Sequence, residues 1–437
     1  GRFTYAYDQK YFAEVNMGYN GSEQFAPSKR YGFFPAVSAS WVVSKENFLK
    51  NNSIITNLKL RASYGVVGND KMGSARFLYQ DKITVGSGGL GSISQGQRIN
   101  LGLLGNPNLG WEVAKKQNYG VDIQLIKSLN LSLDYYFEHR SNILITRGNT
   151  PALQGIPLSN VPKGNLGIVD NEGLEIELKY NKMLFKDFSL SVSGNFGYNH
   201  NIQVYADEPM SDETYAYVYR KTGYSIGQQW GFRIDYSNGN GYFNSEEELD
   251  RWLETKTCSF GTPRVGDFIY KDLNGDNVID DRDEAPIKYS SIPGITYGLT
   301  LDASYKSFDF NVFIQGIGRY SGYYWRDVVT ETPYMGTYFG YHKTAWTAER
   351  YAKGEEITYP ALSQYFGYNH KPNDFFIMNR AFTRLKNIEL GYTLPEGALK
   401  KLGIQNLRIF VSGQNLFTWD HLRMDHLDPE NTDMVGY

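Results

Sequence analysis

Short segments in which apolar and polar residues alternate are the feature of this sequence that most constrains its fold. The clearest of these segments are residues 58–66, 129–138, 174–180, 297–305 and 407–411. Successive side chains of a β-strand point to opposite faces, so each segment predicts a strand with one apolar and one polar face. Twelve such segments follow one another along the 437 residues. Most approach the roughly 9–11 residues that a tilted strand needs to cross the hydrocarbon layer of a membrane.

The connectors between the predicted strands are alternately short and long. The short ones include residues 127–128, 182–187, 306–307 and 395–405, and the long ones are residues 68–116, 141–172, 201–294 and 318–380. Outer-membrane β-barrels combine short periplasmic turns with long extracellular loops, whereas a soluble β-sandwich has no reason to keep this alternation. We therefore predict an all-β fold, in which residues 1–437 form part of one transmembrane antiparallel β-barrel with about twelve strands and the long connectors are extracellular loops.

The two faces of the predicted strands differ in a way that suits a membrane. Lys59, Arg61, Asp134, Glu175 and Asp302 fall on polar faces, as expected for side chains that line a hydrated lumen. The opposite faces carry Leu, Ile, Val and Phe, with tyrosine near the strand ends, where its ring lies among outer-membrane lipid while its hydroxyl reaches the wet interface. The alternative is that these tyrosines fill the core of a soluble β-protein.

The composition excludes several classes of protein. There are 44 Lys and Arg against 47 Asp and Glu, so no nucleic-acid or other polyelectrolyte partner is implied. The mean hydropathy is −0.46, and no apolar run approaches the ~20 residues of a membrane-spanning helix. The single cysteine, Cys258, excludes a disulfide framework and is interpreted as incidental. The sequence has no HExxH, GxSxG or P-loop motif, so no enzyme activity is predicted.

The direction of the strands predicts that this sequence is part of a longer barrel. If the long connectors are extracellular, residues 406–414 form an outward strand, and the strand that would return to the periplasm is missing. A closed bacterial barrel has an even number of strands and no free edge, because unpaired backbone groups in lipid cost several kcal/mol each. We therefore expect barrel strands to be missing at both ends.

Several stretches resemble the SusC/RagA-like TonB-dependent outer-membrane transporters. These are RYGFFPAVSASWVVSKENF (30–48), LKLRASYGVVGN (58–69), NPNLGWEVAKKQNYGVDI (106–123), GDFIYKDLNGDNVIDDRD (266–283), RLKNIELGYTLP (384–395) and LRIFVSGQNLFTW (407–419). They occur in the order of the family and cover nearly the whole chain. The resemblance implies a barrel of 22 strands. The first strands and the last strand of that barrel are absent here, as are the plug domain and the TonB box of the family.

This resemblance also implies a function and a set of partners. The family imports oligomeric nutrients, glycans or peptides, across the outer membrane of Gram-negative bacteria. A SusD-like surface lipoprotein closes over the barrel as a lid, and the TonB–ExbB–ExbD complex supplies energy through the missing N-terminal part. Two alternatives stay open on the residues alone: a soluble or surface carbohydrate-binding β-protein, and a passive porin-like barrel.

The motif DLNGDNVIDDRD has the spacing of a calcium loop. Positions 1, 3, 5, 7, 9 and 12 of such a loop, which supply oxygen ligands, are occupied by Asp272, Asn274, Asp276, the Val278 carbonyl, Asp280 and Asp283. Asn277 replaces the glycine of position 6, a mild departure because Asn tolerates the left-handed conformation. Asp283 replaces the longer glutamate of position 12. We predict a structural Ca²⁺ site that stiffens an extracellular loop; the alternative is an acidic turn that binds nothing.

Aromatic residues in the long connectors are the other candidates for binding. The six residues singled out are Tyr217, Tyr219, Trp230, Tyr323, Tyr324 and Trp325. Flat rings with polar tips suit sugar faces, peptide groups and a partner lipoprotein alike. The alternative, which we favour for any single residue, is that these rings pack the loops on one another. A short helix is also predicted within residues 244–256, because Ser245 and Glu248 have the spacing of a capping box.

Overall fold

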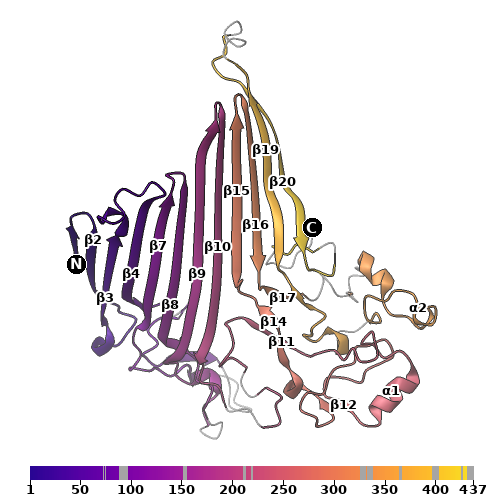
Figure 1. The fold of residues 1–437 in the computed structure, drawn as a ribbon. Coiled ribbons are helices and arrows are strands. Elements are labelled where there is room, and N and C mark those ends of the chain that lie inside the picture. Colours follow the sequence, from indigo (N-terminus) through magenta and orange to yellow (C-terminus); the bar gives the residue numbers. More distant parts are fainter. Residues whose placement is uncertain are drawn as a thin grey trace.

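A large antiparallel sheet dominates the structure (Figure 1), a computed structural model. It describes residues 1–71, 73, 75–87, 97–150, 155–209, 213–217, 220–324, 331, 338–363, 367–395, 403–424 and 427–430. The sheet contains twelve strands in chain order, in which the edge strands pair with one neighbour and every other strand pairs with the strands before and after it. They are β1 (Arg2–Tyr7), β2 (Tyr11–Gly21), β3 (Tyr31–Val42), β4 (Ile55–Asn69), β7 (Glu112–Leu125), β8 (Leu129–Ile145), β9 (Gly164–Phe185), β10 (Phe188–Tyr205), β15 (Ile295–Tyr305), β16 (Phe308–Gly318), β19 (Phe382–Thr393) and β20 (Arg408–Asp420). The predicted number of strands is therefore confirmed.

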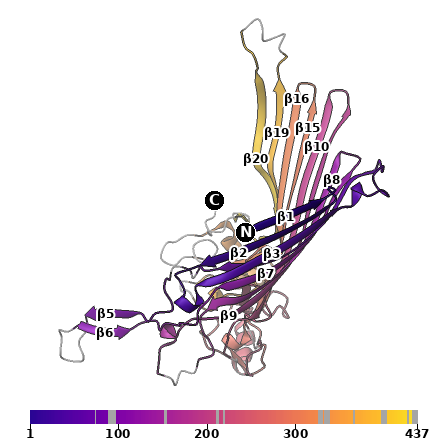
Figure 2. The ribbon, with the colours of Figure 1, turned by 90° about the vertical axis from the view of Figure 1, so that its left-hand side faces the viewer.

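The sheet is curved and strongly twisted, and its two ends differ (Figures 1 and 2). Short turns join the strands at one end. At the β1–β2 and β7–β8 turns, pairs of residues with positive φ give the local twist that tight hairpins require, namely Asp8 with Gln9 and Ile126 with Lys127. All the long connectors gather at the opposite end (Figure 1). Among the described residues, no helix is long and apolar enough to span a membrane.

Some strands are longer than the sequence predicts. β8 continues to Ile145 and β9 begins at Gly164, so the connector between them is shorter than the predicted loop 141–172. In the same way β4 and β7 extend into the predicted loop 68–116, and β10 extends to Tyr205. The alternation of apolar and polar residues ends sooner than the backbone ladder, which continues through register shifts such as the one between Arg140 and Ile143.

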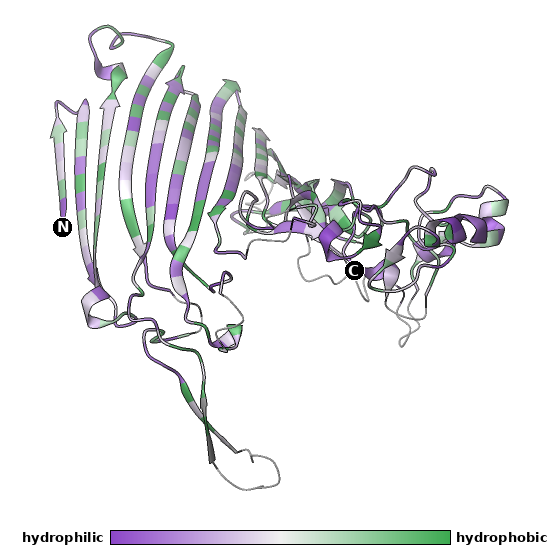
Figure 3. Ribbon diagram, turned by 90° about the horizontal axis from the view of Figure 1, so that it is seen from below, coloured by the Kyte–Doolittle hydropathy of each residue, from purple (hydrophilic) through white to green (hydrophobic). Residues whose placement is uncertain are grey.

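The alternation of faces follows directly from the register. Colouring by hydropathy shows hydrophilic and hydrophobic bands in turn along the strands (Figure 3). On the polar face, the Arg61 guanidinium on β4 lies 2.9 Å from Asp122 on β7 and 2.8 Å from Asp134 on β8. Lys116 and Arg140 both contact Glu138 on the same face. Opposite charges are thus paired on the polar face, both along one strand and across neighbouring strands.

The long connectors contain smaller elements. Two-stranded sheets are formed by β5 (Ile83–Ser87) with β6 (Gln97–Leu101), β11 (Gln228–Gly231) with β14 (Ala285–Ser290), β12 (Thr257–Cys258) with β13 (Val278–Ile279), and β17 (Ser321–Tyr323) with β18 (Ile377–Asn379). Among the described residues the α-helices are α1 (Glu246–Leu253) and α2 (Ala348–Ala352). The predicted helix is confirmed, because the Ser245 side chain accepts a hydrogen bond from the Glu248 amide at the start of α1. The β5–β6 hairpin projects away from the sheet (Figure 2).

The main hydrophobic core lies in the connectors. We call the described residues of 228–290, 320–379 and 421–430 the loop module. Its buried core contains the fully enclosed side chains of Phe232, Tyr270, Tyr359 and Phe376, together with residues from the segment after β20. Strand side chains lie on either the apolar or the polar face of a single-layered sheet, so few of them are buried. The loop module therefore folds around its own core, while the sheet depends on its backbone ladder.

We predict that Phe376→Ala opens the loop module and leaves the sheet intact. Phe376 is 0 % exposed, and removing a buried Phe side chain costs about 3–5 kcal/mol. Proteolysis of intact outer membranes should then cleave the module, while the heat-dependent migration of the barrel on SDS gels stays unchanged. Tyr351→Ala on α2, where the ring is already exposed, is the control. Equal protease resistance in both variants would contradict the prediction.

Candidate functional site

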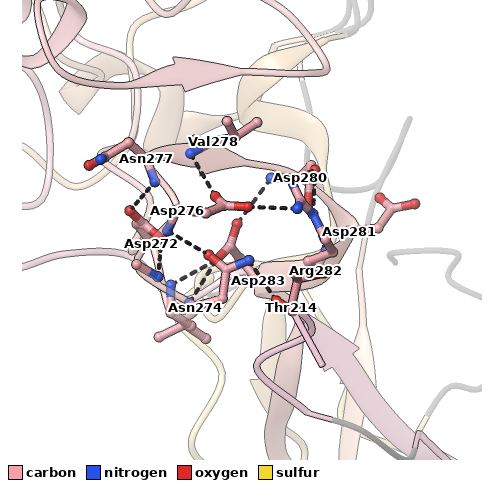
Figure 4. A network of polar contacts seen from close by, with 12 residues as sticks. Thr214, Asp272, Asn274, Asp276, Asn277, Val278, Asp280, Asp281, Arg282 and Asp283 are labelled. Carbon is pink, nitrogen blue, oxygen red and sulfur yellow. Dashed lines mark hydrogen bonds and ion pairs between the residues drawn. The ribbon is translucent and has the colours of Figure 1, made fainter. Parts of the chain in front are cut away.

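The segment 272–283 forms a compact loop held by its own side chains (Figure 4). Asp272 accepts hydrogen bonds from the Gly275 and Asn277 amides at 2.7 and 3.0 Å. Farther along, Asp276 accepts from the Val278 amide at 2.9 Å. Asn277 has φ +66°, as expected for the residue that replaces glycine at position 6. The alternating polar side chains thus turn the backbone as the motif predicts.

Asp283 fastens the two ends of this loop together. It is 0 % exposed, and its carboxylate accepts hydrogen bonds from the backbone amides of Leu273, Asn274 and Asp280 at 2.7, 3.3 and 3.0 Å. Burial raises the pKa of the Asp283 carboxyl, although these three donors oppose the change. Without Asp283 the three amides would lose their acceptor inside the loop.

Cationic side chains already compensate much of the acidic charge. Arg282 Nη1 lies 2.7 Å from Asp276 Oδ2, and Arg282 Nη2 lies 2.7 Å from Asp280 Oδ2. The hydrogen bonds from Arg282 hold the pKa of Asp280 below its usual value. Lys256 Nζ lies 3.4 Å from Asp272. In the described residues, no three His, Cys, Asp or Glu side chains are placed so that they could hold a metal ion. A cation at Asp276 and Asp280 would have to displace Arg282.

The aromatic candidates mostly contact one another or the loop module. The Trp230 ring lies 6.2 Å from Tyr217 and 4.8 Å from Tyr224, both edge-on. Tyr323 donates its hydroxyl hydrogen to the His370 carbonyl oxygen. Tyr324 is 3 % exposed and belongs to the module core, into which the β17–β18 pairing draws it.

Two of the aromatic candidates, Tyr219 and Trp325, lie outside the described residues.

A buried ion-pair cluster was not foreseen from the sequence. Arg384, on the polar face of β19, lies 2.5 Å from Asp428 and 2.7 Å from Glu430. Lys386 also contacts Glu430, and Arg380 donates to the Pro429 carbonyl oxygen. These contacts fold the segment after β20 back over β19. Asp428 and Glu430 are close together in the sequence, but nothing there pairs them with Arg384, more than 40 residues away.

The fold and its charged inner face define a class of protein, the outer-membrane β-barrels. Residues 1–261 match the family model described as "TonB dependent receptor-like, beta-barrel". Because this match covers more than half of the 437 residues, the chain belongs to that family. Its location is accordingly the outer membrane of a Gram-negative bacterium, and the predicted partial barrel fold is confirmed.

Curated relatives support the same assignment. The chain is 29 % identical over 442 residues to TonB-dependent receptor P3 of Formosa agariphila, a match that covers 96 % of this chain and 40 % of that protein. It is 26 % identical over 447 residues to TonB-dependent receptor SusC of Bacteroides thetaiotaomicron, covering 98 % and 41 %. The resemblance to SusC-like receptors is therefore confirmed. The chain spans about two fifths of the length of these relatives.

Solved structures show the same fold. The RagAB peptide transporter superposes with a TM-score of 0.72 at 21 % identity, covering 100 % of this chain and 44 % of that chain. The RagAB peptide importer in its open-open state gives the same TM-score and coverage. At this level of identity the similarity establishes architecture, and the twelve strands correspond to part of a larger barrel.

We predict that Cys258 is unreactive in the folded protein. It is half-buried on β12, and burial raises the pKa of its thiol to about 11. At pH 8 only about one thiol in a thousand is then ionised, and the thiolate is the reactive form. Iodoacetamide should label Cys258 slowly before unfolding and completely after it. Exposed Ser237→Cys in a Cys258→Ser background is the control that should react promptly, and equal rates would contradict the prediction.

Proposed function

We propose that this chain forms the wall and mouth of an active importer of oligomeric nutrients. The observation that carries the proposal is its membership of the TonB-dependent receptor β-barrel family, shown over residues 1–261. A charged, ion-paired inner face supports it, because a hydrated lumen lets polar cargo pass. The loop module adds a folded structure at the mouth of the barrel, where cargo is captured.

The partners of the proposed importer follow from the same family. A SusD-like surface lipoprotein closes over the loop module as a lid, and TonB–ExbB–ExbD acts on a plug that lies outside residues 1–437. The chain itself does no bond-making chemistry. The RagAB structure is described as a peptide transporter, and the SusC/RagA-like family that the chain resembles imports glycans or peptides, so we propose oligosaccharides or peptides as the cargo class.

We predict that uptake in the native bacterium depends both on this protein and on TonB. One of two pools of probes, fluorescent oligosaccharides or fluorescent oligopeptides, should enter wild-type cells. Its uptake should fall to background when either the gene for this protein or the gene for TonB is inactivated. Pull-down of the tagged protein should recover a surface lipoprotein. Uptake that survives loss of TonB would instead identify a passive porin-like barrel and contradict the proposal.

We further propose that the loop 272–283 takes up Ca²⁺ as a structural ion. The spacing of its oxygens supports this proposal, and each carboxylate oxygen that accepts one backbone hydrogen bond keeps a further lone pair. The residues that would hold the ion are Asp272, Asn274, Asp276, Val278, Asp280 and Asp283. Their carboxylates would have to draw together around it, because no three of the described acidic side chains are so placed without the ion. Arg282 would then leave Asp276 and Asp280, so that binding and rearrangement of this side chain are coupled.

We predict that millimolar Ca²⁺ raises the thermal stability of the wild-type loop module and that Asp272→Ala with Asp276→Ala abolishes the effect. A ligand that binds the folded state stabilises it in proportion to the logarithm of its concentration above Kd. Tryptophan fluorescence during heating measures the shift, and Asp250→Ala on the exposed face of α1 is the control. An equal calcium response in the double variant, or none in wild type, would exclude the site.

A further inference from the structure

A cavity of about 230 Å³ lies where β10 extends beyond β15 at the loop end of the sheet. The last residue pair between these strands is Tyr198 with Ile295, whereas β10 continues to Tyr205. The freed edge of β10 faces the connectors around it. The polar residues that line the cavity include Asn199, Asn201, Gln228, Lys288, Tyr289 and Arg319.

The cavity is cationic. Lys288 and Arg319 both line it, and none of the described residues in its lining is acidic. The Arg319 guanidinium lies 5.7 Å from the rings of both Tyr198 and Tyr289. Within the described part of the chain it has no carboxylate partner and no hydrogen-bond acceptor. An arginine held between two rings and lacking an acid is placed to receive an anion from outside.

The other charged groups near the cavity oppose Lys288 more than Arg319. Asp374 acts electrostatically on Lys288, and burial lowers the pKa of this ammonium group. Lys288 donates one hydrogen bond to the Ile377 carbonyl oxygen at 2.9 Å, which leaves two ammonium hydrogens. The acid Glu172 lies 3.9 Å from Nδ1 of His200, another residue lining the cavity. That acid is therefore directed to His200, and Arg319 keeps its charge available.

Both cations sit on strained backbone. Lys288 has φ +49° and Arg319 has φ +50°, in the left-handed region that favours glycine. Most other such residues lie in tight turns or, like Asn142 in β8, at register shifts, and Lys288 likewise lies at the register shift between β11 and β14. Arg319 instead follows the end of β16. Strain of this kind persists where the surroundings fix it and gathers at ligand sites. Glycine would relieve it at either position but would remove the charge.

Asn199, which also lines the cavity, has a side-chain acceptor that lacks a partner. The Asn199 Oδ1 atom is buried and receives no hydrogen bond from any described residue. Buried polar atoms are nearly always paired, so an orphaned acceptor calls for a donor from a ligand or an ordered water. A ligand that satisfies this cavity therefore carries an anionic group and a hydroxyl or amide hydrogen close to it.

We propose that this cavity is a binding site for the carboxylate of a soluble ligand that also bears a neighbouring donor. Arg319 and Lys288 bind the carboxylate, and Asn199 accepts the hydrogen. An acidic sugar and the carboxyl end of a peptide share this chemistry. The interpretation of this site as a contact for imported cargo rests on the proposed function. Binding is measured without transport, so the carboxylate site and the proposed import function can each fail independently.

The test is ligand-observed NMR on the intact protein in detergent with two matched pairs of probes. Glucuronate is compared with glucose, and N-acetylglycine with N-acetylglycinamide. At least one acid should bind, and its neutral counterpart should not. The acid that binds names the source of the carboxylate. If neither acid binds, or if acid and neutral probe bind equally, the proposal is overturned.

Two variants separate binding from folding. Arg319→Asn removes the charge, but asparagine tolerates the left-handed backbone, so the variant should unfold without ligand at the same or a higher temperature. Its affinity for the acid probe should fall at least about tenfold. Asn199→Asp keeps the shape and should abolish acid binding by repulsion. Lys353→Gln, an exposed cation paired with Glu349 on α2, is the control that keeps full affinity. Unchanged affinity in Arg319→Asn would overturn the proposal.

Discussion

A backbone amide in hydrocarbon must find its hydrogen-bond partner within the protein, and the rest of this structure depends on how the twelve strands meet that requirement. Every strand of the sheet from β2 to β19 pairs on both sides, and its partners are the sheet strands that come before and after it in the sequence. This antiparallel succession allows very short turns at one end. It leaves the other end to carry every long connector, and with them all the residues proposed to bind ligands.

The wall and the loop module are stabilised by different physics. In the wall, apolar side chains such as Leu299 and Val411 remain exposed because they face lipid, and the charged face is balanced by pairs such as Arg61 with Asp134. In the loop module, rings such as Tyr359 and Phe376 are buried in a hydrophobic core like that of a water-soluble protein. The Arg384–Asp428 pair joins the two parts at the inner rim.

Local patterns predict what local physics determines. The period-two alternation of residues 129–138 located β8, and Ser245 located the start of α1, because strand faces and helix caps depend on neighbours in sequence. The backbone turns of the loop 272–283 were equally predictable. The extension of β9 to Gly164 was not, since a ladder continues wherever the adjacent strand offers partners, whatever the hydropathy.

Contacts between distant segments explain the remainder of what the sequence could not predict. The cavity brings Asn199, Lys288 and Arg319 together from three separate segments, and no periodicity connects them. The burial of Tyr324 follows from the pairing of β17 with β18, two strands of three residues each that leave almost no pattern. In the same way, the role of Arg282 at Asp276 and Asp280 depends on side-chain direction and not on spacing.

We infer that the sheet has one face toward lipid and one face toward water. Cysteine labelling along β10 measures this difference between the two faces. In a Cys258→Ser background, single cysteines replace Leu190, Ser191, Val192 and Ser193 in turn, and a water-soluble maleimide is applied to the protein in membranes. We predict rapid labelling at positions 191 and 193 and protection at positions 190 and 192. Uniform labelling at all four positions, or the opposite alternation, would contradict it.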